Sequence, residues 1–397
     1  MFKYIAYLQI FASFFFAFFS LFFPGIITYK QFVVVLGGLS LIAILYEFIV
    51  DFRNQAVFLL VIILLALLVF SYYTTGQRYG YYSEKYPSFF LVLLGNLTPV
   101  VLCAVIVSKH PLIQQQIIRL APIVSVIFTV LAFVSTFFHT SSTSGGYIDN
   151  EFGLNYQTIS YAAAYGGALA GFFVNCHKTV HWPLFFNANI WKVIMLSTIY
   201  LDFVIILFAG GRGGLIMFLM QIVLFLYILS RRRVSWKQRL AVVLIFFLTI
   251  IFIPVLINYV QSSGFENAGF ERIVEFIREN DQSGRQGLRA KAFESFLEKP
   301  VFGHGIGSVF YEIGHYSHNS VLDVLVETGI IGLIFYVGML GFVFFRLVKM
   351  INKDTVSSLW AVLFLGSFMM SLSSGYYLAQ LPMWWTVTFV ILKQNNR

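Results

Sequence analysis

A histidine followed by two carboxylates is the group in this chain best suited to chemistry. The segment reads Ser317-His318-Asn319-Ser320-Val321-Leu322-Asp323-Val324-Leu325-Val326-Glu327-Thr328-Gly329. Ser320 and Asp323 have the spacing of a capping box that opens a helix, so His318 is expected just before it. Asp323 and Glu327 are four residues apart and share one helix face. The pattern predicts carboxylates that orient a general-base imidazole; alternatively, Asp323 caps the helix and Glu327 pairs with an arginine.

Arg212 stands between four glycines, in Ala209-Gly210-Gly211-Arg212-Gly213-Gly214-Leu215. Glycine lets a backbone approach a ligand closely and adopt turns that other residues resist. An arginine fork presented in such a turn suits the paired oxygens of a phosphate or pyrophosphate. The alternative is a short turn between two helices with an arginine that extends to the membrane surface.

Arg285 and Arg289 are four residues apart, and they share a helix face if the helix begins near Ser283. Two arginines on one face predict a second anion site. The alternative is a solvated surface helix, because the surrounding loop 258–319 holds eight acidic and six basic residues.

The same loop contains two stretches with amphipathic helix spacing, 271–278 and 288–297, and Pro300 ends the second. In the second stretch the apolar residues Phe293, Phe296 and Leu297 form a face that lies either on the membrane surface or on the helix bundle.

Membrane spans must position all of these residues. The 397 residues are 59% hydrophobic and only 11% charged, whereas a soluble domain averages about 25% charged residues. This composition excludes a soluble enzyme, a disordered protein and a nucleic-acid binder. Apolar runs long enough for about twelve transmembrane helices lie at 4–23, 32–50, 55–73, 89–107, 120–138, 157–176, 190–209, 214–230, 240–257, 321–345, 356–373 and 377–392.

Lysine and arginine set the expected orientation of this all-α integral membrane protein. With both termini in the cytoplasm, 16 of them fall inside and only four fall in short outside loops. The chain 1–397 is then a single polytopic domain, and 258–319 is one long extracytoplasmic loop between spans nine and ten, with short amphipathic helices. Cys103 and Cys176 fall in or at the ends of spans and are expected to be packing residues.

Three features in one order resemble the O-antigen ligase and O-antigen polymerase superfamily of bacterial envelope enzymes. They are the glycine-flanked Arg212, the run Ser283-Gly284-Arg285…Phe293…Pro300…Gly303-His304-Gly305-Ile306-Gly307, and His318-Asn319-x-x-Leu322-x-x-Leu325-x-Glu327-x-Gly329-x-x-Gly332-Leu333. The resemblance covers about residues 200–335. Asn155, in Phe152-Gly153-Leu154-Asn155, also resembles the asparagine that opens a central span. His304 departs from the pattern, where a small apolar residue is more usual, so the role of that loop stays open.

The resemblance implies a glycosyltransferase in the bacterial cytoplasmic (inner) membrane, with its active site on the extracytoplasmic side. Such an enzyme transfers a glycan from an undecaprenyl-pyrophosphate carrier to a hydroxyl of a second glycan, without a metal ion, another cofactor or a nucleotide sugar. Its expected partners are the lipid-linked donor, the acceptor and the lipid bilayer, with a chain-length regulator left open and no nucleic acid.

The resemblance also implies roles for individual residues. Arg212 and Arg285 are expected to hold the pyrophosphate, with Arg289 as a weaker candidate, and His318 to act on the acceptor hydroxyl. A supporting role is implied for four further residues: Asn155, Asn319, Asp323 and Glu327.

Two activities share these motifs. A polymerase joins lipid-linked repeat units in capsule, exopolysaccharide or O-antigen synthesis, and a ligase moves the finished glycan to lipid A core or another acceptor. The Phe-, Ile- and Lys-bearing composition is typical of a low-GC bacterium, one lacking lipopolysaccharide, which favours the polymerase. A third alternative is a flippase or transporter of lipid-linked oligosaccharides. Many such carriers have a long cytoplasmic loop between spans six and seven, and that connection is short here.

Overall fold

The computed structural model describes residues 55–79, 97–138, 156–176, 187–231 and 285–393, with short pieces at 9–11, 31–32, 34–39, 42, 255 and 273. These residues form helices joined by turns and loops, and no strand occurs among them, which confirms the all-α class. Asn155, the helix expected at 271–278, and most of the spans expected at 4–23, 32–50 and 240–257 lie outside this described part.

The chain divides into two compact units. The first comprises Met1–Ile117, Gln282–Arg346 and Ser367–Arg397, and the second comprises Ile118–Asp281 and Leu347–Gly366. His318, Arg285 and Arg289 therefore belong to the first unit, and Arg212 belongs to the second.

Five described helical segments are long and apolar enough to cross a membrane. They are α7 (Pro111–Phe138), α9 (Ala188–Ala209), α10 (Arg212–Arg231), α15 (Ser320–Lys353) and the run Thr355–Ser373, which contains η3 (Thr355–Ser357) and α16 (Ser358–Ser373). Two further apolar helices, α6 (Thr98–Lys109) and α17 (Leu381–Leu392), are shorter. The chain is an integral membrane protein; the count of twelve spans and their orientation remain predictions.

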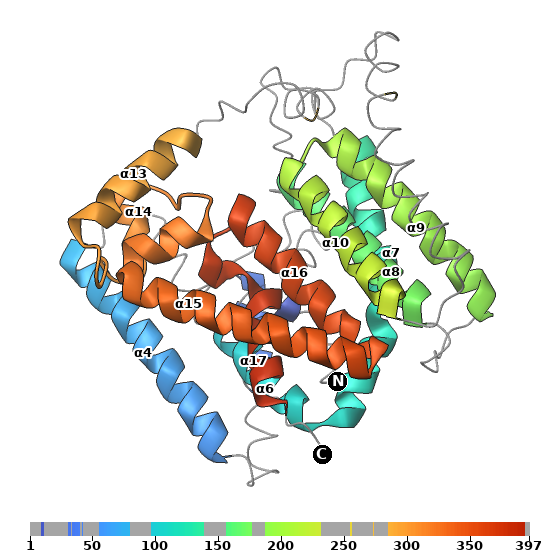
Figure 1. Cartoon of the computed structure of the whole chain (residues 1–397), viewed down its shortest axis with the longest axis horizontal. Coiled ribbons are helices and arrows are strands. Elements are labelled where there is room, and N and C mark those ends of the chain that lie inside the picture. Colours follow the sequence, from blue (N-terminus) through green and yellow to red (C-terminus); the bar gives the residue numbers. More distant parts are fainter. Residues whose placement is uncertain are drawn as a thin grey trace. The chain divides into compact units, whose positions relative to one another are not determined.

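In the second unit, α8 (Tyr156–Cys176) packs against α9 and α10 (Figure 1). Small residues of α8 make this packing close: a Cβ atom at Gly166 would lie 2.8 Å from Oδ2 of Asp202 on α9. Asp202 is fully buried and accepts a hydrogen bond of 2.9 Å from Thr129 Oγ1 on α7. The buried carboxyl therefore links α7 to α9. Cys103 and Cys176 are free and buried, as expected of packing residues.

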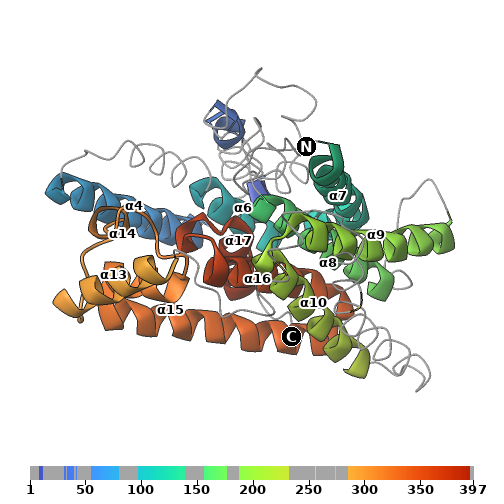
Figure 2. The same ribbon diagram turned by 90° about the horizontal axis from the view of Figure 1, so that it is seen from above.

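In the first unit, α4 (Gln55–Tyr79) and α17 both pack on α6. Two shorter helices, α13 (Arg285–Glu298) and α14 (Val309–Glu312), lie beside the N-terminal part of α15 (Figure 2). The helix predicted at 288–297 is thus confirmed as α13, which begins three residues earlier and ends before Pro300.

The long helix α15 is broken at Gly329 and completed there by a neighbouring loop. Gly329 has φ 65° and ψ −165°, which interrupts the helical hydrogen bonds. The loop Pro300–Gly305 supplies the missing partners through four backbone hydrogen bonds: Ile330 N to Pro300 O (2.8 Å), Ile331 N to Val301 O (3.4 Å), His304 N to Val326 O (2.8 Å) and Gly305 N to Glu327 O (2.8 Å). A Cβ atom at Gly329 would lie 2.3 Å from Val301 O, so the close approach requires glycine.

Candidate active site

His318 lies immediately before α15 in an unusual backbone conformation. Its φ is 57°, and among the described residues it is the only non-glycine residue with a positive φ. Such a conformation costs about 1–3 kcal/mol and persists where neighbouring contacts enforce it. Here Asp323 Oδ1 accepts a hydrogen bond of 2.8 Å from Ser317 N, and Ser317 Oγ donates to Asn319 O at 3.0 Å. The backbone on both sides of His318 is therefore fixed.

The start of α15 differs from the predicted capping box. Asn319, rather than Ser320, caps the helix: its Oδ1 accepts from Val321 N at 3.0 Å and from Leu322 N at 3.4 Å. Because the chain turns sharply at His318, the Asp323 carboxylate reaches back to the amide of Ser317 and not to that of Ser320. Asn319 is thus the residue that caps α15, and the supporting role that the resemblance implies for it stays a prediction.

The imidazole of His318 is half-buried among aromatic rings. It stacks on His315, with centroids 5.1 Å apart, and lies 4.5 Å from the ring of Tyr316. Its Nδ1 lies 3.4 Å from Ser374 O. A carbonyl oxygen only accepts hydrogen bonds, so this contact favours the tautomer with the proton on Nδ1 and the lone pair on Nε2.

The charge state of His318 suits a base. Burial, followed by the positive charge of Arg285 and the proximity of His315, lowers the pKa of the His318 imidazole to about 4. The ring is therefore neutral near pH 7, and its Nε2 has a lone pair that can accept a proton.

A segment between α16 and α17, Ser373–Tyr377, holds several groups of the site together. Ser373 O accepts a hydrogen bond of 2.9 Å from an Nη atom of Arg285. The next carbonyl, Ser374 O, accepts from Tyr316 Oη at 2.9 Å and faces His318 Nδ1. Two consecutive carbonyls therefore position an arginine and a histidine from different elements. Sequence reasoning missed this segment; its signal is the polar and aromatic run Ser373-Ser374-Gly375-Tyr376-Tyr377 between two apolar runs.

Glu327 contacts this segment and has no hydrogen bond to His318 within the described residues. Its two carboxylate oxygens accept from Tyr376 Oη at 2.7 and 2.8 Å and from Tyr377 Oη at 2.8 Å. Burial, then the charge of Glu327, raises the pKa of Tyr376 well above its usual value, so its hydroxyl stays protonated and donates. Among the residues that the structure describes, neither Asp323 nor Glu327 hydrogen-bonds to the imidazole and Glu327 pairs with no arginine, so both readings are wrong for this part of the chain. Asp323 instead holds the backbone amide of Ser317, and Glu327 holds the side-chain hydroxyls of Tyr376 and Tyr377.

Arg285 and Arg289 both lie on α13, four residues apart, which confirms that they share a helix face. The charge of each lowers the pKa of His318, Arg285 more strongly than Arg289, so both guanidinium groups are near the imidazole. The Nε of Arg289 is buried and has no hydrogen-bond partner among the described residues. An anion placed between these side chains would satisfy that donor.

Arg212 is the first residue of α10, directly after the turn that ends α9. The flanking glycines serve packing within the second unit: Gly211 N donates to Ser160 Oγ at 3.0 Å, and a Cβ atom at Gly214 would lie 2.5 Å from Ser160 Cβ. Gly210 ends α9 with φ 76°. The glycine run thus brings the α9–α10 turn close to α8, and Arg212 stands at the positive end of a helix.

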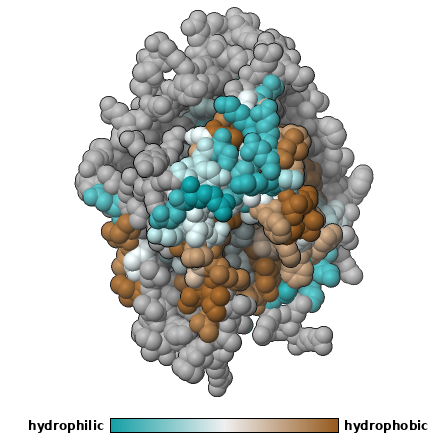
Figure 3. Space-filling view, turned by 90° about the vertical axis from the view of Figure 1, so that its left-hand side faces the viewer, coloured by the Kyte–Doolittle hydropathy of each residue, from teal (hydrophilic) through white to brown (hydrophobic). Residues whose placement is uncertain are grey.

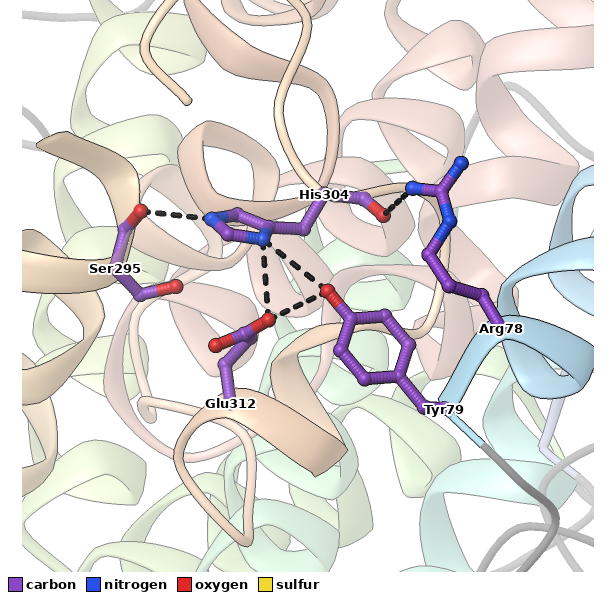
Figure 4. A network of polar contacts seen from close by, with 5 residues as sticks. All are labelled: Arg78, Tyr79, Ser295, His304 and Glu312. Carbon is purple, nitrogen blue, oxygen red and sulfur yellow. Dashed lines mark hydrogen bonds and ion pairs between the residues drawn. The ribbon is translucent and has the colours of Figure 1, made fainter. Parts of the chain in front are cut away.

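His304, whose role the sequence left open, has a different environment (Figure 4). It is almost fully buried, and its Nε2 faces Ser295 O at 2.9 Å. Its Nδ1 lies 3.0 Å from Glu312 Oε1 and 3.2 Å from Tyr79 Oη, and Tyr79 Oη donates to Glu312 Oε1. The pKa of Tyr79 is raised by burial and by Glu312. This network connects α4, α13 and α14 and leaves neither ring nitrogen for a ligand.

The O-antigen ligase family model matches residues 197–337 of the chain. Comparison with curated proteins and with solved structures gave no match. The matched segment contains Arg212, Arg285 and His318, which belong to the motifs that carry the resemblance, and also Arg289. Over residues 197–337 the chain is therefore similar to the O-antigen ligase family, which supports the resemblance to the O-antigen ligase and O-antigen polymerase superfamily.

Proposed function

We propose that the protein polymerises undecaprenyl-pyrophosphate-linked oligosaccharide repeat units at the outer face of the cytoplasmic membrane. One observation carries the proposal: the adjacent carbonyls of Ser373 and Ser374 hold an arginine and a neutral histidine side by side. A glycosyl transfer from a pyrophosphate carrier needs one group to bind the leaving anion and one to accept a proton.

In the proposed reaction, Nε2 of His318 accepts the proton of the acceptor hydroxyl. The hydroxyl oxygen bonds to the anomeric carbon of the donor as the bond from that carbon to the pyrophosphate oxygen breaks. Negative charge grows on the departing pyrophosphate, and Arg285 and Arg289 stabilise it. A pyrophosphate-binding role for Arg212 rests on the family resemblance alone. The family resemblance implies inversion at the sugar.

The ligase is the second candidate, and the family model that matches residues 197–337 is described as O-antigen ligase. The residues and the chemistry are the same, and only the acceptor differs. The composition of the chain, typical of a low-GC bacterium, favours the polymerase.

Purified protein in liposomes with a synthetic undecaprenyl-pyrophosphate repeat unit tests both candidates. The polymerase yields a ladder of longer glycans from this single substrate. A ligase yields no ladder and instead transfers a preformed glycan to added lipid A core. If Arg212→Ala and His318→Ala both leave the product unchanged, the assigned site is wrong.

A further inference from the structure

The helix α13 presents three different stripes along its length. Ala292 and Ser295 are buried against the protein. On one side of this buried face lies an exposed stripe of four residues at the spacing i, i+4, i+7 and i+11: Gln286, Ala290, Phe293 and Leu297. On the other side of the buried face lies a second exposed stripe with the same spacing: Gly287, Lys291, Glu294 and Glu298. One flank of the helix is therefore largely apolar and the other charged.

The apolar stripe contains large exposed side chains: Phe293 is 50% exposed and Leu297 is 57% exposed. The chain continues from α13 into Val301, which is 48% exposed, and Phe302, which is 76% exposed. Figure 3, which shows this side of the first unit, has a hydrophilic band with hydrophobic surface below and beside it. Exposed apolar surface of this kind marks a contact with a partner or a membrane.

This apolar surface continues into a helix that crosses the membrane. Hydrogen bonds from Ile330 N and Ile331 N to the loop place Val301 and Phe302 against the N-terminal third of α15, beside Gly329. From there α15 exposes Ile334 (64%) and Phe335 (75%). Only 22% of its most apolar window is buried inside the protein, and α15 is long and apolar enough to cross a membrane, so this exposed surface is suited to contact lipid.

We infer that α13 is an interfacial helix whose stripe at Phe293 and Leu297, together with Phe302, lies in the acyl-chain region of the bilayer. The charged stripe at Glu294 and Glu298 then faces water, as in helices that lie in the membrane surface. Arg285 and Arg289 begin the same helix and so lie at the depth of lipid headgroups. If the proposed function is correct, that is the depth at which a carrier lipid presents its pyrophosphate.

Spin labels on single cysteines in the full-length protein, reconstituted in phosphatidylcholine liposomes, test this inference without any need for turnover. Cys103 and Cys176 are first replaced by alanine. The labelled variants are Phe293→Cys, Leu297→Cys and Phe302→Cys, with Glu294→Cys and Glu298→Cys as matched controls on the same helix and Phe335→Cys as the lipid reference. The readout is the ratio of collision rates with oxygen, which concentrates in lipid, and with a water-soluble nickel chelate.

The ratios at positions 293, 297 and 302 are expected to approach that at 335 and to exceed those at 294 and 298 several-fold. Ratios equal to those at 294 and 298 would overturn the inference, and low collision rates with both reagents would show that protein covers the stripe. A lipid-like ratio that arises only after undecaprenyl pyrophosphate is added would assign the stripe to the carrier chain and not to the bilayer. Because these labels report on location alone, an inactive protein with lipid-like ratios would refute only the proposed function.

Discussion

His318 and His304 stand fourteen residues apart in the same unit, and they differ in the hydrogen-bond partners of their ring nitrogens: His304 is almost fully buried, whereas His318 is half-buried. Both ring nitrogens of His304 face oxygen atoms of the protein: Ser295 O on one side, and Glu312 with Tyr79 on the other. Among the described residues, His318 has one oxygen acceptor, Ser374 O, at Nδ1, and two arginines lie near its ring. A histidine with both nitrogens paired is a structural connector, whereas one with a single paired nitrogen has a lone pair left for a substrate.

The matched variants His318→Gln and His304→Gln give the sharpest test of this contrast. His318→Gln is expected to lower the rate of ladder formation about 10²–10⁴-fold, because a positioned general base contributes about that much. His304→Gln should retain the rate per folded molecule. Initial rates with the synthetic repeat unit, divided by the folded fraction from gel filtration, measure both. Equal losses of rate per folded molecule in the two variants would show that His318 has no catalytic role that His304 lacks.

The variant Arg285→Gln tests whether the positive charge near His318 contributes to catalysis and lowers the pKa of the imidazole. Loss of one anion-stabilising donor is expected to reduce the rate about 10²–10³-fold at pH 7. It should also change the pH profile. The unprotonated ring is the active form, so the wild-type rate falls as the pH drops through the pKa of His318, about 4. Without the positive charge the pKa rises, and this fall moves to higher pH, although burial keeps it below about 6.5.

The pH dependence is measured between pH 4 and 8 with the same liposome assay. Arg289→Gln provides the graded comparison, since Arg289 lowers the pKa of His318 less than Arg285 does, and its profile should move less. An unchanged profile in Arg285→Gln would mean that this guanidinium does not act on the imidazole.

Glu327→Gln tests whether a residue that does not contact His318 still positions it. Glutamine has one side-chain oxygen where glutamate has two, so it cannot accept all the hydrogen bonds from Tyr376 and Tyr377. A buried hydroxyl left without an acceptor reduces the stability of the folded protein by about 1–3 kcal/mol. We expect a lower kcat with little change in KM, because the segment Ser373–Tyr377 then holds Arg285 and His318 less firmly. Tyr377→Phe is the matched control: it removes one donor, leaves Tyr376 on Glu327, and should reduce kcat less. A change in KM alone would indicate substrate contact instead.

The smallest effect on turnover is expected in the His304 network. Glu312→Gln removes the charge beside His304 Nδ1 and is expected to lower the melting temperature of the detergent-purified protein, since it weakens the connection of α4 to α13 and α14. Activity per folded molecule should remain within a few-fold of wild type. A large loss of turnover with an unchanged melting temperature would give this network a catalytic role that its geometry does not indicate.

The sequence allowed the local parts of the site to be predicted. The helix that carries Arg285 and Arg289, its end before Pro300, and the place of His318 just before α15 all follow from spacing and helix-terminating residues. The cap was misplaced by one residue, because a left-handed histidine cannot be recognised from composition.

The contacts between residues far apart in the sequence could not be predicted from spacing and helix-terminating residues. Ser373 O and Ser374 O lie 88 and 56 residues along the chain from Arg285 and His318, and both acceptors are backbone carbonyl oxygens, which every residue possesses. Nothing in the residue type of Ser373 marks it as a partner of an arginine. Helix periodicity predicts a functional role for Glu327, with His318 or an arginine as its partner. The partners among the described residues are instead Tyr376 and Tyr377.

The break in α15 has a consequence for how the protein matures. When a helix with such a break enters the membrane, two amides and two carbonyls around Gly329 are left without partners until Pro300–Gly305 docks against them. Unpaired backbone groups in lipid are costly, so docking of the loop completes the insertion of the helix. Glu327 accepts one of those loop hydrogen bonds through its carbonyl and holds Tyr376 and Tyr377 through its carboxylate. The loop that completes this span is therefore connected, through Glu327, to the segment that holds Arg285 and His318.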